Sequence, residues 1–232
     1  MPAVIEVKDL VQIVRKKVIL NKLSFEMQEG ECFGVFGTRG TGKTTLVHIL
    51  AGIDKFKSGI VRVMNCDLNK TEKFKASLGL VTQEQSLFQD LKVCENLDFI
   101  ATLKNADKTN ILPLVERFEL KDCLKEPVST LEAGMYQRLS MACALLNKPR
   151  LLLVDELIDD LDLYSQHLIL KELKNFLATG GSCLWAFKKI ELCEHMNRVG
   201  WLENGQLTIY QPRDLKEKWQ NLNQAFSIKS GE

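Results

Sequence analysis

The chain has 232 residues, 45% of them hydrophobic and 26% charged, which is typical of a soluble globular protein with room for one large α/β domain. Its 31 basic and 30 acidic residues give a net charge of +1, which argues against a dedicated nucleic-acid binder, since such proteins carry a basic face. No apolar run approaches the roughly 18 residues of a membrane span, and early charges argue against a signal peptide at the N-terminus. A membrane role is therefore expected to come through a partner.

Apolar runs separated by turn residues predict the elements of the first half of the chain. Short early strands are expected in "VIEV", "VIL" and "LSFEM". The β-prone run "CFGVF" precedes a glycine-rich turn and the helix "KTTLVHILAG", and further strands are expected in "GIVRVM" and "LGLVT". From about residue 90 to 148 the periodicity becomes helical, in "VCENLDFIATL", "ILPLVERF" and "MYQRLSMACALL".

The second half returns to alternating strands and helices. "RLLLV" is a short, fully apolar run of the kind found inside parallel sheets. A helix "LYSQHLILKELKNFLA", a strand "SCLWAF", a short helix and a hairpin "VGWLENGQLTIY" follow, and Asn204-Gly205 supplies the hairpin turn. The polar tail after Pro212 has room for one helix. This pattern predicts an α/β fold with a mostly parallel sheet, an antiparallel β edge and an inserted helical subdomain.

The seven cysteines are scattered and odd in number, and none form a CxxC pair. This pattern favours reduced thiols in a cytosolic protein over disulfides. Buried small hydrophobic side chains are expected here rather than metal ligands. The cysteines are Cys32, Cys66, Cys94, Cys123, Cys143, Cys183 and Cys193.

A glycine-rich loop lies between the predicted strand "CFGVF" and the helix after it, and it matches the pattern G-x-x-x-x-G-K-[ST]. Its backbone N–H groups and the helix N-terminus are suited to phosphate oxygens. Lys43 would place a charge near the β- and γ-phosphates, and the Thr44 hydroxyl could ligate Mg²⁺. Arg39 has two open interpretations, a phosphate contact or a solvated side chain. The predicted nucleotide-binding residues are Gly37, Thr38, Arg39, Gly40, Thr41, Gly42, Lys43, Thr44 and Thr45.

The apolar run "LLLVDE" ends in two carboxylates, Asp155 and Glu156. In nucleotide hydrolases, Asp155 at such a position would hold Mg²⁺ through water, and Glu156 would polarise the attacking water. The alternative is a strand that simply ends in solvated acids. The phosphate-binding loop about 110 residues earlier favours the catalytic interpretation.

Four further stretches, "LVTQEQSLFQDLKVCENL", "LEAGMYQRLSMACALLNKPRLLLVDE", "LIDDLD" and "RVGWLENGQL", resemble the nucleotide-binding domain of ABC transporters. The resemblance covers essentially the whole chain and is closest to ATPase subunits of ABC-2-type exporters. It implies a P-loop NTPase (RecA-like) core at about residues 1–85 and 149–211, a helical insertion at about 86–148 and a C-terminal tail at about 212–232, all within one ATP-binding domain of residues 1–232.

The family's mechanism implies a specific set of cofactors and partners. Two such domains sandwich two ATP molecules, and each site takes its signature segment from the other chain. The resemblance implies ATP and Mg²⁺, with Gln83 as a further Mg²⁺ ligand that reports to the helical insertion. It also implies an integral membrane transporter subunit as partner, and a cytoplasmic protein that is peripheral on the inner face of the membrane. No nucleic-acid partner is expected.

The sequence departs from the family's pattern at the base and signature positions. Val14 stands where an aromatic side chain usually stacks on adenine, a loss of about 1 kcal/mol. The signature reads Leu131, Glu132, Ala133, Gly134, Met135, so a carboxylate replaces the usual serine. A carboxylate at a helix N-terminus gains about 0.3–1 kcal/mol. Facing a partner's phosphate at ~4 Å, with an effective dielectric near ~20, each charge pair costs on the order of 4 kcal/mol.

Two other positions also depart from the family's pattern. Counting back from "RVGWLENG" puts Phe187 at the switch-histidine position, and its ring cannot hydrogen-bond a phosphate. Asp159 and Asp160 stand where the family has small and hydroxyl residues. In a symmetric pair these acids would face their own copies near the twofold axis. The alternative is that they are solvated loop acids.

These departures favour an ATP-binding exporter subunit with slow hydrolysis over one with ordinary turnover. A partner with an intact signature would complete this chain's ATP site, so a heterodimer is favoured over a homodimer. The alternative is a soluble, non-transport ABC ATPase that acts as a regulatory or assembly module.

Overall fold

Two β-sheets form the framework of the chain, of which the computed structural model describes residues 3–158 and 161–229. One sheet has six strands in the order β10-β9-β3-β8-β7-β6, and the other has four in the order β2-β1-β4-β5. The strands are β1 (Ala3–Val14), β2 (Lys17–Gln28), β3 (Cys32–Phe36), β4 (Ser58–Val63), β5 (Cys66–Asp67), β6 (Leu78–Val81), β7 (Leu151–Asp155), β8 (Ser182–Phe187), β9 (Arg198–Glu203) and β10 (Gln206–Tyr210).

The six-stranded sheet is parallel except for β10, which pairs antiparallel with β9. Every residue of β3, β7 and β8 is buried, because both faces of this sheet are covered. The apolar runs "CFGVF", "RLLLV" and "SCLWAF" predicted these strands, and the mostly parallel α/β fold is confirmed. The carboxyl ends of β3, β7 and β8 therefore lie side by side at one edge.

The antiparallel sheet differs from its prediction in strand length. β1 and β2 each have 12 residues, although the sequence predicted several short strands in this region. Their exposed polar positions break the apolar runs into short pieces, while the backbone pairing continues from Ala3↔Gln28 to Val14↔Lys17. The tight connection between these strands uses Arg15 and Lys16, both with positive φ.

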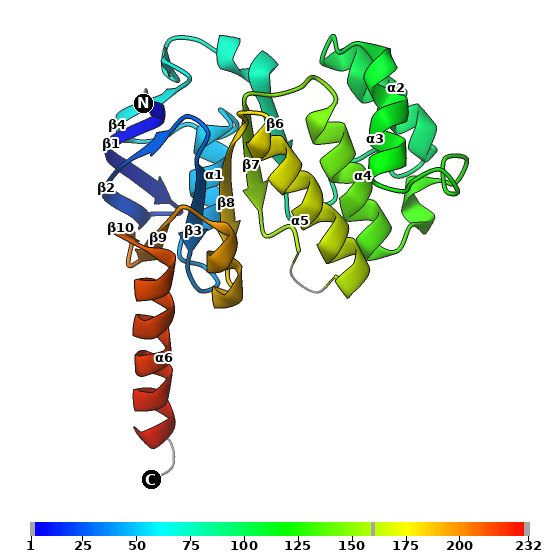
Figure 1. The fold of residues 1–232 in the computed structure, drawn as a ribbon. Helices are drawn as coiled ribbons and strands as arrows, with labels where there is room; N and C mark the ends of the chain where they lie inside the picture. Colours follow the sequence, from blue (N-terminus) through cyan, green and yellow to red (C-terminus); the bar gives the residue numbers. More distant parts are fainter. Residues whose placement is uncertain (1–2, 159–160, 230–232) are drawn as a thin grey trace.

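Helices cover the parallel sheet on both faces (Figure 1). The α-helices are α1 (Lys43–Leu50), α2 (Val93–Leu103), α3 (Ile111–Arg117), α4 (Ala133–Leu145), α5 (Leu163–Ala178) and α6 (Pro212–Lys229). Short 3₁₀ helices are η1 (Lys73–Ser77), η2 (Lys108–Asn110), η3 (Val128–Thr130) and η4 (Ile190–His195). Helices α2, α3 and α4 fall within the predicted helical insertion.

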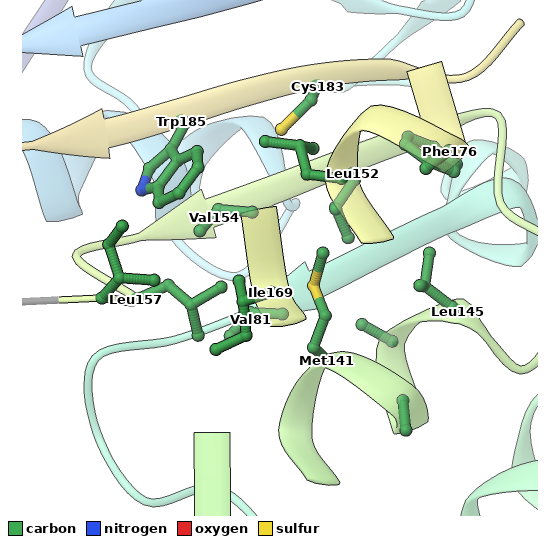
Figure 2. Packing of buried hydrophobic residues seen from close by; sticks show 14 of the residues in the cluster. Val81, Met141, Leu145, Leu152, Val154, Leu157, Ile169, Phe176, Cys183 and Trp185 are labelled. Carbon is green, nitrogen blue, oxygen red and sulfur yellow. The ribbon is translucent and has the colours of Figure 1, made fainter. Parts of the chain in front are cut away.

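Two hydrophobic cores result from this layering. Buried residues of α1 pack with the antiparallel sheet and one face of the parallel sheet. On the other face, α4 and α5 bury Met141 and Ile169 against Leu152 and Val154 of β7 and Trp185 of β8 (Figure 2). The central strands are thus fixed from both sides, which holds their carboxyl ends in place.

The C-terminal part of the chain closes the sheet with a hairpin and a long helix. Asn204 and Gly205 have φ values of 51° and 76°, as the predicted two-residue turn requires. Helix α6 then extends away from the body (Figure 1), and its Trp219 packs edge-on against Phe36 and Trp201. None of the helices in residues 3–158 and 161–229 is long and apolar enough to cross a membrane.

Candidate functional site

The predicted phosphate-binding loop connects β3 to α1 at the carboxyl edge of the parallel sheet. Gly40 and Gly42 adopt φ values of 82° and 105°, a region that side chains disfavour. A Cβ atom on Gly42 would also lie 2.8 Å from Cγ2 of Ile19. Glycine at these positions therefore allows the tight backbone path of the loop.

Lys43 begins α1 and is almost fully buried, with 3% of its side chain exposed. Its ammonium group donates to the carbonyl oxygens of Gly37 at 2.8 Å and Thr38 at 3.0 Å. It also pairs with Oε1 of Glu156 at 3.0 Å. Lys43 is thus held inside the loop by three contacts, at the place where the sequence predicted a phosphate-facing charge.

Glu156 follows the end of β7 with a φ of 49°, an uncommon conformation for a residue with a side chain. Its backbone N–H donates to the carbonyl of Ala186 at 2.9 Å, which fixes this turn. Its carboxylate is 10% exposed and faces Lys43, and Oε2 accepts a hydrogen bond from Nε2 of Gln83 at 3.3 Å. The unusual backbone therefore directs the carboxylate toward the phosphate-binding loop and Gln83.

Asp155, the last residue of β7, is fully buried, and neither carboxylate oxygen has a hydrogen-bond partner. Burial raises the pKa of this carboxyl above its usual range. The nearby Thr44 hydroxyl offsets this shift in part, although the two groups do not form a hydrogen bond of good geometry. An unpaired buried carboxylate is costly, and a cation would relieve it.

Asp155, Thr44 and Gln83 together offer a carboxylate, a hydroxyl and an amide oxygen, a donor set that suits Mg²⁺. No group of three His, Cys, Asp or Glu side chains able to hold a metal occurs among the described residues. Mg²⁺ commonly takes only one or two protein carboxylates and completes its shell with water and phosphate oxygens. The residues present therefore fit a Mg²⁺ ion that arrives with a phosphorylated ligand.

Thr44 and Gln83 border a cavity of about 420 Å³, whereas the fully buried Asp155 does not line it. Its polar wall contains Thr44, Thr45 and Arg39 as well as Lys43 and Glu156, and the exposed Thr38 and Gly40 lie on the same loop. Its apolar wall is aliphatic and is formed by Val14, which is 42% exposed, and Ile19. Val14 thus lies at the site where the sequence placed a base contact, and Ile19 adds an aliphatic neighbour that sequence reasoning missed.

Phe187, the residue predicted at the switch-histidine position, does not line the cavity. Its ring is fully buried and packs 5.9 Å from that of Phe36, centroid to centroid. The next residue, Lys188, lines the cavity instead, and its Nζ lies 3.7 Å from Oε2 of Glu156. Sequence reasoning did not single out Lys188. The first charged residue after the buried run "SCLWAF" would have marked it, as Asp155 marks the end of β7.

The signature segment does not join this cavity within one chain. Glu132 and Ala133 are exposed at the start of α4, whereas Leu131 and Met135 are half-buried. Glu132 occupies the N-cap position of α4, but its side chain makes no capping hydrogen bond, so the expected cap contact is absent. The helix N-terminus is therefore not capped by a hydrogen bond to the Glu132 carboxylate.

Gly134 is the buried member of the signature. A Cβ atom there would overlap Oδ2 of Asp162 and Oγ of Ser165, which begin α5. Asp162 caps α5 by accepting a 2.8 Å hydrogen bond from the N–H of Ser165. Glycine is thus required where the two helix starts touch. The predicted loop acids Asp159 and Asp160 lie outside the described residues.

A glycine-rich loop at a strand–helix junction, a buried lysine and an acidic strand end define the class of P-loop nucleoside triphosphatases. The sequence profile of the family described as "ABC transporter" matches residues 20–159. The chain therefore belongs to the ABC transporter family.

Individual relatives agree with this assignment. The chain is 32% identical to Nod factor export ATP-binding protein I of Neorhizobium galegae over 90% of its own length, and it spans 62% of that relative. It is 25% identical to the lantibiotic transport ATP-binding protein SrtF of Streptococcus pyogenes, with 96% of each chain covered. The solved structure of an ATP-binding subunit of an ABC transporter shares the fold, with a TM-score of 0.84, 22% identity, and 94% and 93% of the two chains covered.

Proposed function

We propose that the chain is the ATP-binding subunit of an ABC transporter, and specifically of an exporter. The observation that carries the proposal is the preformed group of Lys43, Glu156 and Asp155 around a loop built for phosphates. The export and transport roles in the names of the relatives support the exporter assignment.

In the proposed reaction, the loop N–H groups and Lys43 bind the β- and γ-phosphates of ATP. Glu156 then orients and polarises the attacking water from the acidic edge of the sheet. A Mg²⁺ ion held by Thr44, Gln83 and Asp155 would supply charge neutralisation of the phosphates. Because Lys43 and Glu156 are paired with each other at 3.0 Å, nucleotide binding must exchange this ion pair for phosphate contacts before Glu156 can act on water.

We further infer that hydrolysis is slow. The exposed Glu132 carboxylate would face the partner's phosphate in a head-to-tail pair, and like charges at that distance repel. Phe187 cannot hydrogen-bond a phosphate or an attacking water, so the inference rests on Glu132, on Phe187 and on the Lys43–Glu156 pair. A heterodimer with a partner that has a serine in its signature would avoid the repulsion at this chain's own ATP.

Turnover of the purified chain, measured beside its Glu156→Gln variant, tests this inference. We expect less than ~1 ATP per second, below the median for enzymes. Turnover of several per second that the Glu156→Gln change abolishes would contradict slow hydrolysis while still supporting an ATPase.

The proposed partner is an integral membrane subunit, which would place the chain at the cytoplasmic face of a membrane. Purification of the tagged chain from native membranes tests this step. Recovery of a stoichiometric multi-span membrane protein is the expected result. Recovery of the chain alone, with ATP binding intact, would instead favour the non-transport regulatory or assembly module.

A further inference from the structure

A second cavity, of about 650 Å³, lies at the opposite edge of the parallel sheet from the phosphate-binding loop. Pro149 and Arg150, which directly precede β7, line this cavity, and so do Gly180 and Gly181, which precede β8. The proposed reaction uses none of these residues. The volume falls within the roughly 300–1,000 Å³ of pockets that bind small organic molecules.

The floor of this second cavity is apolar and comes from separate parts of the chain. Pro113 and Leu114 of α3 and Leu145 of α4 belong to the predicted helical insertion, and Phe176 belongs to α5, which follows β7. Leu145 and Phe176 lie at the same end of the hydrophobic cluster (Figure 2). A Cβ atom on Gly181 would lie 2.4 Å from the Phe176 ring, so glycine there leaves room for this ring. A ligand needs an apolar body to cover such a floor.

Cationic side chains form the rim, and none of the described residues that line this cavity is acidic. Two of these cations are already paired with carboxylates that lie outside the lining. Arg117 donates hydrogen bonds to the buried carboxylate of Glu172, and Arg150 pairs with Glu29 at 2.6 Å. The two carboxylates therefore offset most of the charge of the two arginines.

Lys148 is the third cation of the rim. Its side chain is exposed, and its ammonium group makes no ion pair or hydrogen bond with any residue in the described ranges 3–158 and 161–229. The pKa of the Asp107 carboxyl is lowered mainly by hydrogen bonds from Thr109 and in smallest part by the charge of Lys148, so the attraction between Asp107 and Lys148 is weak. One ammonium group at the rim is thus available to a ligand.

The helix ends at this cavity do not take up that ammonium group. Helices α4 and α5 both end here, and the last carbonyl groups of a helix carry partial negative charge. At the end of α5, the carbonyls of residues 175–177 accept hydrogen bonds from the N–H groups of residues 179–181. At the end of α4, the carbonyls of Leu145 and Leu146 are likewise hydrogen-bonded. The Lys148 ammonium therefore remains the charged group that a ligand can engage.

We propose that this cavity binds a small amphiphilic anion, whose apolar body lies over Leu114 and Phe176 and whose acidic group pairs with Lys148. A single acidic group is expected, because the arginines of the rim already have carboxylate partners. Such a ligand touches α3 and α5 together and so bridges the helical insertion and the core. The inference goes beyond the proposed function, since it requires no nucleotide.

Fluorescence titration of the full chain with two matched probes tests the proposal. Anilinonaphthalene sulfonate has an aromatic body and one acidic group, and phenylnaphthylamine has the same body without the charge. In Lys148→Gln we expect the affinity for the sulfonate to fall about two- to fivefold and that for the neutral probe to stay unchanged, since one exposed ion pair contributes little. Lys171→Gln, at an exposed position of α5 outside the lining, is the matched control and should change neither affinity.

A second pair of variants tests the place of binding. Thr179→Trp puts a bulky ring at an exposed lining position, and we expect the affinity for both probes to fall at least about tenfold, because the ring takes the place of the bound body. Ala178→Trp adds the same ring at the exposed neighbour outside the lining and should change neither affinity. Thermal unfolding of each variant checks that the fold is unchanged.

The outcomes separate this inference from the proposed function. Equal affinities in Thr179→Trp and Ala178→Trp would overturn the cavity as the binding site, and equal effects on both probes in Lys148→Gln would overturn the anionic ligand class. Displacement of the probes by ATP with Mg²⁺ would place them in the nucleotide cavity and would also overturn the inference. A chain that shows the expected probe binding but binds no ATP would contradict the proposed function alone.

Discussion

The phosphate-binding cavity and the signature segment differ in how far one chain completes them. Around the cavity, Lys43 is buried and makes three polar contacts, and Glu156 is held between two ammonium groups. At the signature, Glu132 is exposed and its side chain makes no capping bond. The first site is organised in the single chain, whereas the second lacks a polar partner until another molecule supplies one.

This difference shows where substitutions are tolerated. Changing a residue of the cavity disturbs contacts that already exist within the chain. Glu132 and Ala133 are exposed, and the Glu132 side chain makes no capping hydrogen bond, so we expect the fold to tolerate a departure from the family's signature there. The consequence of such a departure is expected at the interface with a partner rather than in stability.

Removal of the buried lysine should have the largest effect. Lys43→Met keeps much of the volume but loses the charge, and we expect nucleotide affinity to fall by at least about 100-fold, since two charged hydrogen bonds of ~1.5–3 kcal/mol each are lost. Titration with a fluorescent nucleotide measures this. Arg39→Met, at the exposed rim of the loop, is the matched control and should lose much less. Similar losses in both variants would mean that the cavity is not organised around Lys43.

Gly134→Ala should have the next largest effect, because it tests the one buried position of the signature. The added methyl group would overlap Asp162 and Ser165 at the start of α5. We expect a loss of about 1–3 kcal/mol in the free energy of unfolding, measured with urea. Ala133→Ser, at the exposed neighbour, should change it by less than about 0.5 kcal/mol. Equal stability of Gly134→Ala and wild type would show that the contact between the helix starts is loose.

Val14→Tyr should have the smallest effect, and it should strengthen the binding of ATP. A ring on this wall can stack on the base, and we expect ATP to bind about 2- to 10-fold more tightly, corresponding to ~0.5–1.5 kcal/mol. Competition between ATP and CTP, measured by displacement of a labelled nucleotide, would also reveal a gain in base selectivity. Val18→Tyr, on an exposed position of β2 that does not line the cavity, should leave both affinities unchanged. An equal gain in both variants would place the base elsewhere.

Local patterns in the sequence were sufficient to predict most of the fold. The runs that became β3, β7 and β8 are apolar throughout because both faces of their sheet are covered, and the glycine-rich loop could be placed between β3 and α1 from its spacing. The lengths of β1 and β2 could not be predicted, since solvent-facing residues interrupt the apolar pattern without ending the strand.

The candidate site was predicted in part. The loop was predicted from its glycine spacing after a strand, and Asp155 and Glu156 from the acidic end of the apolar run, whereas Gln83 came from the resemblance to the family. Lys188 was missed because no motif marks it, and its place beside Glu156 is evident only from the structure. The missing capping bond of Glu132 could not be foreseen either, because residue type alone does not determine the direction of an exposed side chain.

The central claim is that Glu132 weakens the pairing of two such domains over ATP while leaving ATP binding intact. Light scattering of the wild type and of Glu132→Ser, each with saturating non-hydrolysable ATP analogue, tests it directly. We predict that Glu132→Ser dimerises at protein concentrations at least tenfold lower than the wild type does, with equal affinity for the nucleotide. Equal dimerisation of the two proteins would contradict the claim.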